Sequence, residues 1–328
     1  MKKRMFAFSL IGLLFTMAQT AFAATYLGSW DLRGNGKLDL VYRDGLALRI
    51  VEAGGGTRDY PIGNVAWSLV GARDTDGKAG AELVLRAGND LLIIDHAYQT
   101  QRTYSVGNIS WAVMNISDLN MRPGDEVLVS IGAGIRIIED ADRNYRDVNF
   151  NYNGSWALFG VENLSGKGPE LILNMGNGVK LIDPRLLTVK DFTFPGYTAI
   201  FGVSQLDSKA GLEIVGRTAG AVYVISGGVR SGTKKEYPAT TSSAWAIYGR
   251  TADTDGSAGD EIILVMQGLV RIISHAGGYA RDYPVPSINY SIDSVSNMDG
   301  RAGNEIVLRD AAGLVYVIND KLRTIQRM

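Results

Sequence analysis

The stretch at 74–85 reads DTDGKAGAELVL, an acidic loop containing Gly that ends in Glu82 and leads directly into an apolar run. Similar stretches recur along the chain at steps of 43 to 48 residues, and each ends in an acidic residue. These residues are Asp39, Glu82, Glu126, Glu170, Glu213, Glu261 and Glu305. A period in the forties, with several short strands per unit, is typical of a β-propeller with one blade per repeat. Seven copies therefore predict seven blades.

The fourth repeat shows the strands of one blade most clearly. Predicted strands at 156–161, 170–175, 179–183 and 189–194 are separated by turns, and the turn at 176–178 reads GNG, a tight hairpin signal. No linker or change in composition divides the repeats. The sequence therefore predicts one all-β domain over residues 24–328, a seven-bladed β-propeller with four antiparallel strands per blade.

Residues 1–23 have the features of a signal peptide. Basic residues at 2–4 precede an apolar stretch, and Ala21 and Ala23 are the small residues at positions −3 and −1 of a cleavage site. We expect cleavage between Ala23 and Ala24 and a periplasmic or secreted protein, the alternative being an uncleaved anchor. No later segment approaches the ~20 apolar residues of a spanning helix, so no membrane span is expected after cleavage.

The composition narrows the range of partners. The formal net charge is −1, becomes −4 without the three basic residues of the leader, and is not concentrated in any Lys/Arg run. Such a chain is not expected to bind nucleic acid. It contains no Cys, which excludes disulfides, thiol catalysis and Cys-ligated metals.

The acidic loops resemble the FG-GAP repeat, also called the VCBS-type or integrin α-like repeat. The first loop, DLRGNGKLDLV at 31–41, has oxygen-bearing side chains at positions 1, 5 and 9, Gly at position 6 and an apolar residue at position 10. The resemblance covers all seven repeats. It implies a β-propeller in which the loop between the first two strands often holds Ca²⁺, an ion that takes six to eight hard oxygen ligands.

Two loops are the best calcium candidates, and the metal is expected to have a structural role. Backbone carbonyls and water would complete either ligand set. The candidate ligands are Asp253, Asp255, Ser257 and Glu261 in the sixth repeat, and Asp31, Asn35 and Asp39 in the first. Other loops carry Lys or Arg at position 5. The alternative for those loops is that the side-chain cation replaces the metal while the Glu accepts loop N–H groups.

Aromatic residues recur at the start of the first strand of most repeats. They stand 14 to 16 residues before the acidic residue of their repeat, and Trp30 falls outside this register. The series is Trp67, Trp111, Trp156, Trp245 and Tyr290. It suggests a stacking surface for sugars or an anchor set for a protein partner. The alternative is that each ring packs between neighbouring blades.

Signals for catalysis are weak. The chain has two His residues, His96 and His275, at equivalent turns that read as surface positions, and it contains no HExxH, GxSxG or Walker pattern. We expect an exported, non-enzymatic propeller that binds a glycan or an envelope or extracellular protein at a channel face or blade interface. The alternatives are a polysaccharide-acting enzyme on the same scaffold and a structural module of an envelope complex.

Overall fold

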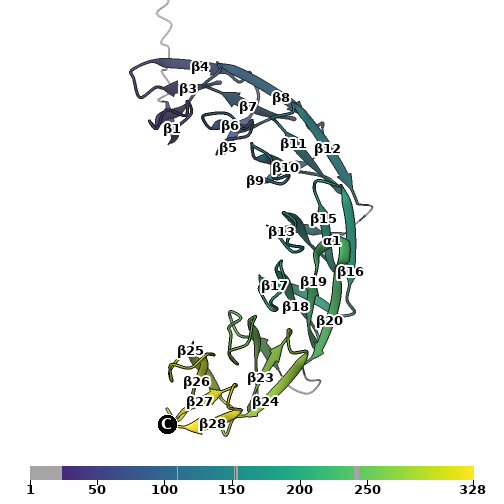
Figure 1. Cartoon of the computed structure of the whole chain (residues 1–328). Helices are drawn as coiled ribbons and strands as arrows, with labels where there is room; N and C mark the ends of the chain where they lie inside the picture. Colours follow the sequence, from purple (N-terminus) through teal and green to yellow (C-terminus); the bar gives the residue numbers. More distant parts are fainter. Residues whose placement is uncertain (1–23, 109, 151, 153, 240–243) are drawn as a thin grey trace, which may run out of the picture. The chain divides into compact units, whose positions relative to one another are not determined.

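A computed structural model describes residues 24–328 except 109, 151, 153 and 240–243. Seven antiparallel sheets of four strands each account for nearly all of its regular structure. Within every sheet the strands are hydrogen-bonded in chain order, as in the blade of a propeller (Figure 1). The prediction of an all-β, seven-bladed β-propeller is therefore confirmed.

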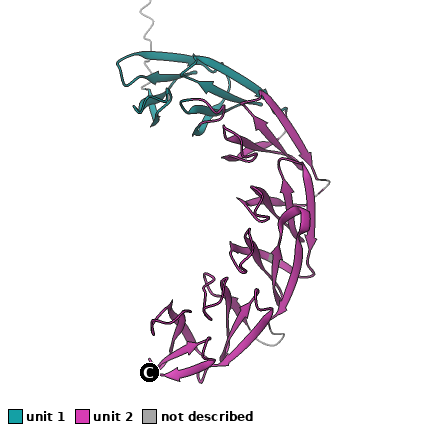
Figure 2. Ribbon diagram, viewed as in Figure 1, with its two compact units in different colours: residues 1–73, 79–107 teal, residues 74–78, 108–328 magenta. Residues whose placement is uncertain are grey.

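The described chain divides into two compact units (Figure 2). Unit 1 comprises Met1–Arg73 and Ala79–Gly107. Its first sheet contains β1 (Thr25–Trp30), β2 (Asp39–Asp44), β3 (Ala47–Val51) and β4 (Thr57–Pro61). Its second sheet contains β5 (Trp67–Arg73), β6 (Glu82–Ala87), β7 (Asp90–Asp95) and β8 (Thr100–Ser105).

Unit 2 comprises Asp74–Lys78 and Asn108–Met328 and holds the other five sheets. The third sheet contains β9 (Trp111–Ser117), β10 (Glu126–Ile131), β11 (Gly134–Glu139) and β12 (Asn144–Asn149). The fourth contains β13 (Trp156–Glu162), β14 (Glu170–Met175), β15 (Gly178–Asp183) and β16 (Thr188–Thr193). The fifth contains β17 (Tyr197–Ser204), β18 (Glu213–Thr218), β19 (Ala221–Ser226) and β20 (Thr233–Pro238).

The sixth sheet contains β21 (Trp245–Ile247), β22 (Glu261–Met266), β23 (Leu269–Ser274) and β24 (Tyr279–Pro284). The seventh contains β25 (Tyr290–Ser296), β26 (Glu305–Asp310), β27 (Val315–Asn319) and β28 (Thr324–Arg327). A single turn of helix, α1 (Gly228–Ser231), lies between β19 and β20 and was not predicted. No helix of the described chain has the length and apolar character needed to cross a bilayer.

The apolar core lies between neighbouring sheets. In unit 2, for example, Ile137 of β11 and Leu173 of β14 belong to one cluster, and both are fully buried. In unit 1, Ile50 of β3 and Leu85 of β6 do the same. This packing explains why the second strands β14, β18 and β22 of unit 2 each begin with an unbroken buried run, since both faces of these inner strands are covered by other sheets.

A β-bulge recurs in the first strand of several sheets. The pairing register shifts between Leu69 and Gly71 in β5, between Leu158 and Gly160 in β13, and between Ile200 and Gly202 in β17. The extra residue of a bulge is not paired with the neighbouring strand, and its side chain points in a new direction. In these three strands that residue is apolar and exposed to solvent. The bulged residues Val70, Phe159 and Phe201 are 41%, 41% and 39% exposed.

Candidate functional site

The Glu that opens the second strand is buried and binds the backbone of its own loop. Glu126 Oε2 accepts the N–H of Leu119 at 2.7 Å, and Glu213 Oε2 accepts that of Leu206 at 2.7 Å. Burial raises the pKa of each carboxyl to about 7. The recurrence of Glu at this position is therefore explained by loop structure without any metal.

Two loops hold a Lys where a metal would sit. Lys209 Nζ lies 2.9 Å from Asp207 Oδ2, and Lys78 Nζ lies 2.7 Å from Asp76 Oδ2. The Lys209 side chain is the main cause that lowers the pKa of Asp207, against the opposing effect of burial. In these loops the side-chain cation neutralises the carboxylate, as the alternative reading of the sequence expects.

The first loop is also held by a cation of its own. Arg33 Nη2 lies 2.7 Å from Asp39 Oδ1, and Asp39 is fully buried. The oxygens of Asp31 accept the N–H groups of Asn35 at 3.0 Å and of Gly36 at 2.7 Å. Asp31, Asn35 and Asp39 are thus engaged in hydrogen bonds or an ion pair within the loop.

The sixth loop fits a divalent cation better. Carboxylate oxygens of Asp253, Asp255 and Glu261 lie within 4.8 Å of one another, and no Lys or Arg stands within the loop at 253–261. Asp255 accepts hydrogen bonds from the Ser257 and Tyr279 hydroxyls. Burial raises the pKa of Glu261 to about 7, the direction expected for a carboxyl that lacks a cation partner. The donor set is hard oxygen, which suits Ca²⁺.

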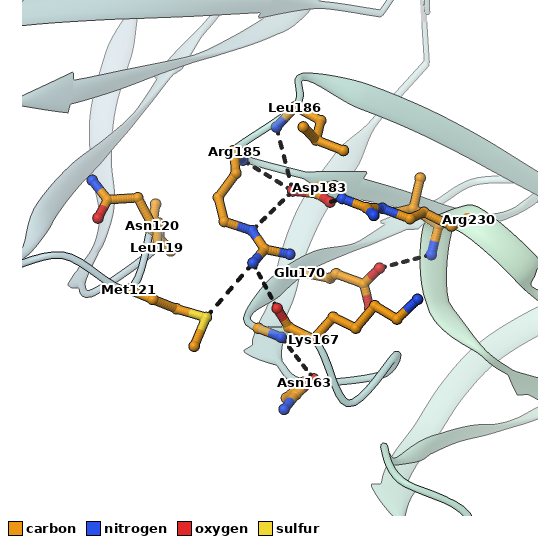
Figure 3. A network of polar contacts seen from close by, with 12 residues as sticks. Leu119, Asn120, Met121, Asn163, Lys167, Glu170, Asp183, Arg185, Leu186 and Arg230 are labelled. Carbon is orange, nitrogen blue, oxygen red and sulfur yellow. Dashed lines mark hydrogen bonds and ion pairs between the residues drawn. The ribbon is translucent and has the colours of Figure 1, made fainter.

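The fourth loop uses a different polar network (Figure 3). Asp183, at the end of β15, accepts the Arg185 backbone N–H at 3.0 Å and faces Arg230 Nη2 of α1 at 3.6 Å. Glu170 Oε1 accepts the N–H of Val229, also in α1, at 2.7 Å. The second oxygen, Oε2, has no hydrogen-bond partner among the described residues, and burial raises the pKa of Glu170. Glu170 and Asp183 thus bind residues of α1, which belongs to the fifth repeat. The positive charges of Arg185 and Arg230 beside them would repel a metal ion.

Most of the aromatic series is buried at the start of its sheet. Trp67, Trp111 and Trp245 are 8%, 3% and 6% exposed. Trp156 Nε1 donates to the Gly132 carbonyl at 3.2 Å, and Tyr290 Oη donates to the Leu269 carbonyl at 2.6 Å, both in the hairpin of the preceding sheet. This arrangement matches the packing alternative for most of the series.

Two members of the series also border a surface hollow. A hollow of about 380 Å³ in unit 2 lies at the ends of β21 and β25 where the sixth and seventh sheets meet. Its walls combine aromatic and apolar side chains with two exposed amides, Gln267 and Asn289. Ile288 stands on it with 63% of its surface exposed. The lining residues are Ala244, Trp245, Ala246, Val265, Met266, Gln267, Ile288, Asn289 and Tyr290, none of which is charged.

The interpretation of the two His residues as surface groups is wrong for His96, which is 2% exposed. Its Nδ1 lies 2.8 Å from Tyr60 Oη of the preceding sheet, and His275 Nδ1 lies 2.9 Å from Tyr237 Oη in the same way. Sequence reasoning missed these contacts between sheets. The available signal was a fourth-strand Tyr followed 36 or 38 residues later by a His.

Comparison with known proteins finds only distant likenesses to solved structures. No family model and no curated protein matches the chain. It is similar to virginiamycin B lyase from Staphylococcus aureus at 15% identity and a TM-score of 0.38, covering 89% of this chain and 93% of that one. It is also similar to an Agrocybe aegerita lectin that recognises non-reducing terminal N-acetylglucosamine. The identity is 10% and the TM-score 0.38, and the match covers 88% of this chain and 89% of the lectin. The Dos1 propeller is similar at 14% identity and a TM-score of 0.39, and the match covers 92% of this chain and 80% of that one.

Proposed function

We propose that this chain is an exported, non-enzymatic binding propeller whose ligand is a neutral glycan held in the hollow between β21 and β25. The observation that carries the proposal is the uncharged lining of that hollow around Trp245 and Tyr290. Its volume of about 380 Å³ lies within the range of small-molecule sites.

The lining chemistry favours a sugar over other small ligands. Sugars combine apolar C–H faces with hydroxyl groups, so they suit a site with aromatic walls and a few amide side chains. Gln267 and Asn289 each offer a donor and an acceptor to hydroxyl groups. Arg217 covers one face of the Trp245 ring at 4.0 Å, so Tyr290 and Ile288 supply most of the accessible apolar surface.

A protein partner is the second candidate. Ile288 is the specific observation in its favour, because a large apolar side chain that is 63% exposed beside a hollow resembles an anchor of a protein interface. A partner would insert an apolar side chain where the glycan proposal places a sugar ring.

We also propose that the chain is a member of the FG-GAP or VCBS-type family and that its sixth loop holds one structural calcium ion. Support comes from the three carboxylates of Asp253, Asp255 and Glu261, whose oxygens lie within 4.8 Å of one another. Asp253, Asp255 and Glu261 would supply charged ligands and Ser257 a hydroxyl, and the ion would stiffen the loop.

The test is binding of residues 24–328 to a neutral glycan array, followed by titration of the best glycan. Changing Gln267 and Asn289 together to Ala should weaken binding about tenfold or more, since each lost hydrogen bond is worth about 1 kcal/mol. Asn89→Ala, in the equivalent hairpin of the second sheet, is the matched control. Ile288→Asp should abolish binding, whereas Leu322→Asp, at a similarly exposed site, should not.

Two results would overturn the glycan proposal. One is an array on which no neutral glycan binds, and the other is a glycan whose affinity is unchanged by Ile288→Asp. If instead a defined protein partner loses affinity on Ile288→Asp and keeps it on Leu322→Asp, the second candidate replaces the first.

A further inference from the structure

A second hollow, in unit 1, has a different chemistry from the one above. It lies between the first strands β1 and β5 and has a volume of about 430 Å³. Four of its lining side chains are apolar, two are hydroxyl-bearing and one is cationic. The lining residues are Thr25, Leu27, Trp30, Arg43, Ser68, Leu69, Val70 and Gly71.

The hollow follows from how blade 1 departs from the repeat. By strand pairing, Ala24 occupies the position at which the later blades have an aromatic ring, because Thr25 pairs with Arg43 as Ser68 pairs with Arg86. Trp30 instead stands at the other end of β1 and folds back over Gly28, where an added Cβ would lie 2.2 Å from the indole. The Trp30 indole therefore forms one wall of the hollow between β1 and β5.

Arg43 is the single charged residue of the lining. Its guanidinium lies 4.1 Å above the Trp67 ring, and its Nη2 donates to the Trp67 carbonyl. Its Nε is buried and has no hydrogen-bond partner among the described residues. An unsatisfied buried N–H costs about 1 to 3 kcal/mol, and the cost is larger for a charged group, so the protein itself does not supply the Arg43 guanidinium with its full set of acceptors.

The charge balance of the lining defines the ligand class. No acidic side chain lines the hollow, so the Arg43 charge is not neutralised by the wall itself. We propose that this hollow binds a small organic acid, with its carboxylate on Arg43 and its apolar body against Leu27, Trp30 and Leu69. Guanidinium and carboxylate form paired, charge-assisted hydrogen bonds that a neutral ligand cannot reproduce.

The bulge in β5 places an apolar side chain on the wall of the hollow where the wall meets solvent. Val70 is the bulged residue, lines the hollow and is 41% exposed. An apolar side chain at this point extends the wall toward solvent, which suits the tail of an aliphatic acid. The site therefore accommodates acids of graded chain length, with affinity increasing with the apolar area that they bury.

The experiment uses residues 24–328 and a series of fatty acids from hexanoate to dodecanoate, each matched with its amide. Affinity is measured by Trp fluorescence titration and checked by saturation-transfer NMR. The acids should bind about tenfold or more tightly than the amides, because a hydrogen bond to a charged group is worth about 1.5 to 3 kcal/mol. Arg43→Gln should remove this preference. Arg217→Gln is the matched control, since Arg217 lies over Trp245 at 4.0 Å in the same manner.

Val70→Asp gives an independent variant, and we expect it to fold because Val70 is 41% exposed. A negative charge on the wall should weaken the acids more than the amides, and Phe201→Asp, at the same bulge of the fifth sheet, should leave both unchanged. The proposal is overturned if no acid of the series binds, if acids and amides bind equally, or if Arg43→Gln leaves the preference intact. Neutral glycan binding should be unaffected by Arg43→Gln, so the two sites are tested separately.

Discussion

Tyr237 Oη lies 2.9 Å from His275 Nδ1, and this hydrogen bond joins the fourth strand of the fifth sheet to the turn after the third strand of the sixth. The other ring nitrogen, Nε2, lies 3.0 Å from Ser226 Oγ of the fifth sheet. Tyr60 and His96 form the same contact in unit 1 at 2.8 Å. Both His residues of the chain thus form hydrogen bonds between neighbouring sheets.

Tyr237→Phe should lower the free energy of unfolding by about 1 to 3 kcal/mol, because it leaves Nδ1 of a half-buried imidazole without its hydrogen-bond partner. Urea denaturation measures the change. Tyr145→Phe is the control, since Tyr145 is a fourth-strand residue that is 45% exposed, and its change should stay within about 0.5 kcal/mol. An equal effect of the two substitutions would contradict a specific role for the contact with His275.

The buried Glu residues give the protein a pH dependence of defined sign. The pKa of Glu213 is raised from 4.5 to about 7 by burial, so the folded state holds the proton more tightly than the unfolded state. Its contribution to stability is fully present below pH 4.5 and is lost as the pH rises to about 7. Relative to Glu213→Gln, the wild type should therefore lose up to about 3 kcal/mol between these limits. Parallel pH profiles of the two proteins would show that Glu213 has no raised pKa.

The sequence predicted the repeat architecture well because that architecture depends on local signals. An acidic residue opens an apolar run once in every repeat, and the strands of the fourth repeat begin and end within a residue or two of the expected positions. The sites depend on contacts between repeats, which no local pattern encodes. Tyr60 of the first repeat reaches His96 of the second from 36 residues away, and Val229 of the fifth reaches Glu170 of the fourth from 59 residues away. The turn of helix α1 was missed because its Gly-rich segment carries no helical periodicity.

Gly216→Ala should be strongly destabilising. A Cβ at Gly216 would lie 1.8 Å from Tyr223 Cζ, and Tyr223 is fully buried and stacked on Phe194 with centroids 4.0 Å apart. Because the ring cannot move without disturbing this stack, we expect a loss of about 2 kcal/mol or more in urea denaturation. Gly202→Ala is the control, since nothing lies within 4 Å of its added Cβ. A change at Gly216 no larger than at Gly202 would show that the core around Tyr223 is loosely packed.

Calcium should stabilise the protein through the sixth loop alone. An ion bound only to the folded state adds about 2.7 kcal/mol when its concentration is about 100 times Kd, so the melting temperature should rise with added CaCl2 and fall with chelator. Changing Asp253 and Asp255 together to Asn removes two of the three clustered carboxylates and should abolish the rise. Asp207→Asn, in a loop where Lys209 lies 2.9 Å from the carboxylate, should leave it intact. A rise that persists in the double variant would place the ion in another loop, and no rise in the wild type would mean that the sixth loop binds no calcium.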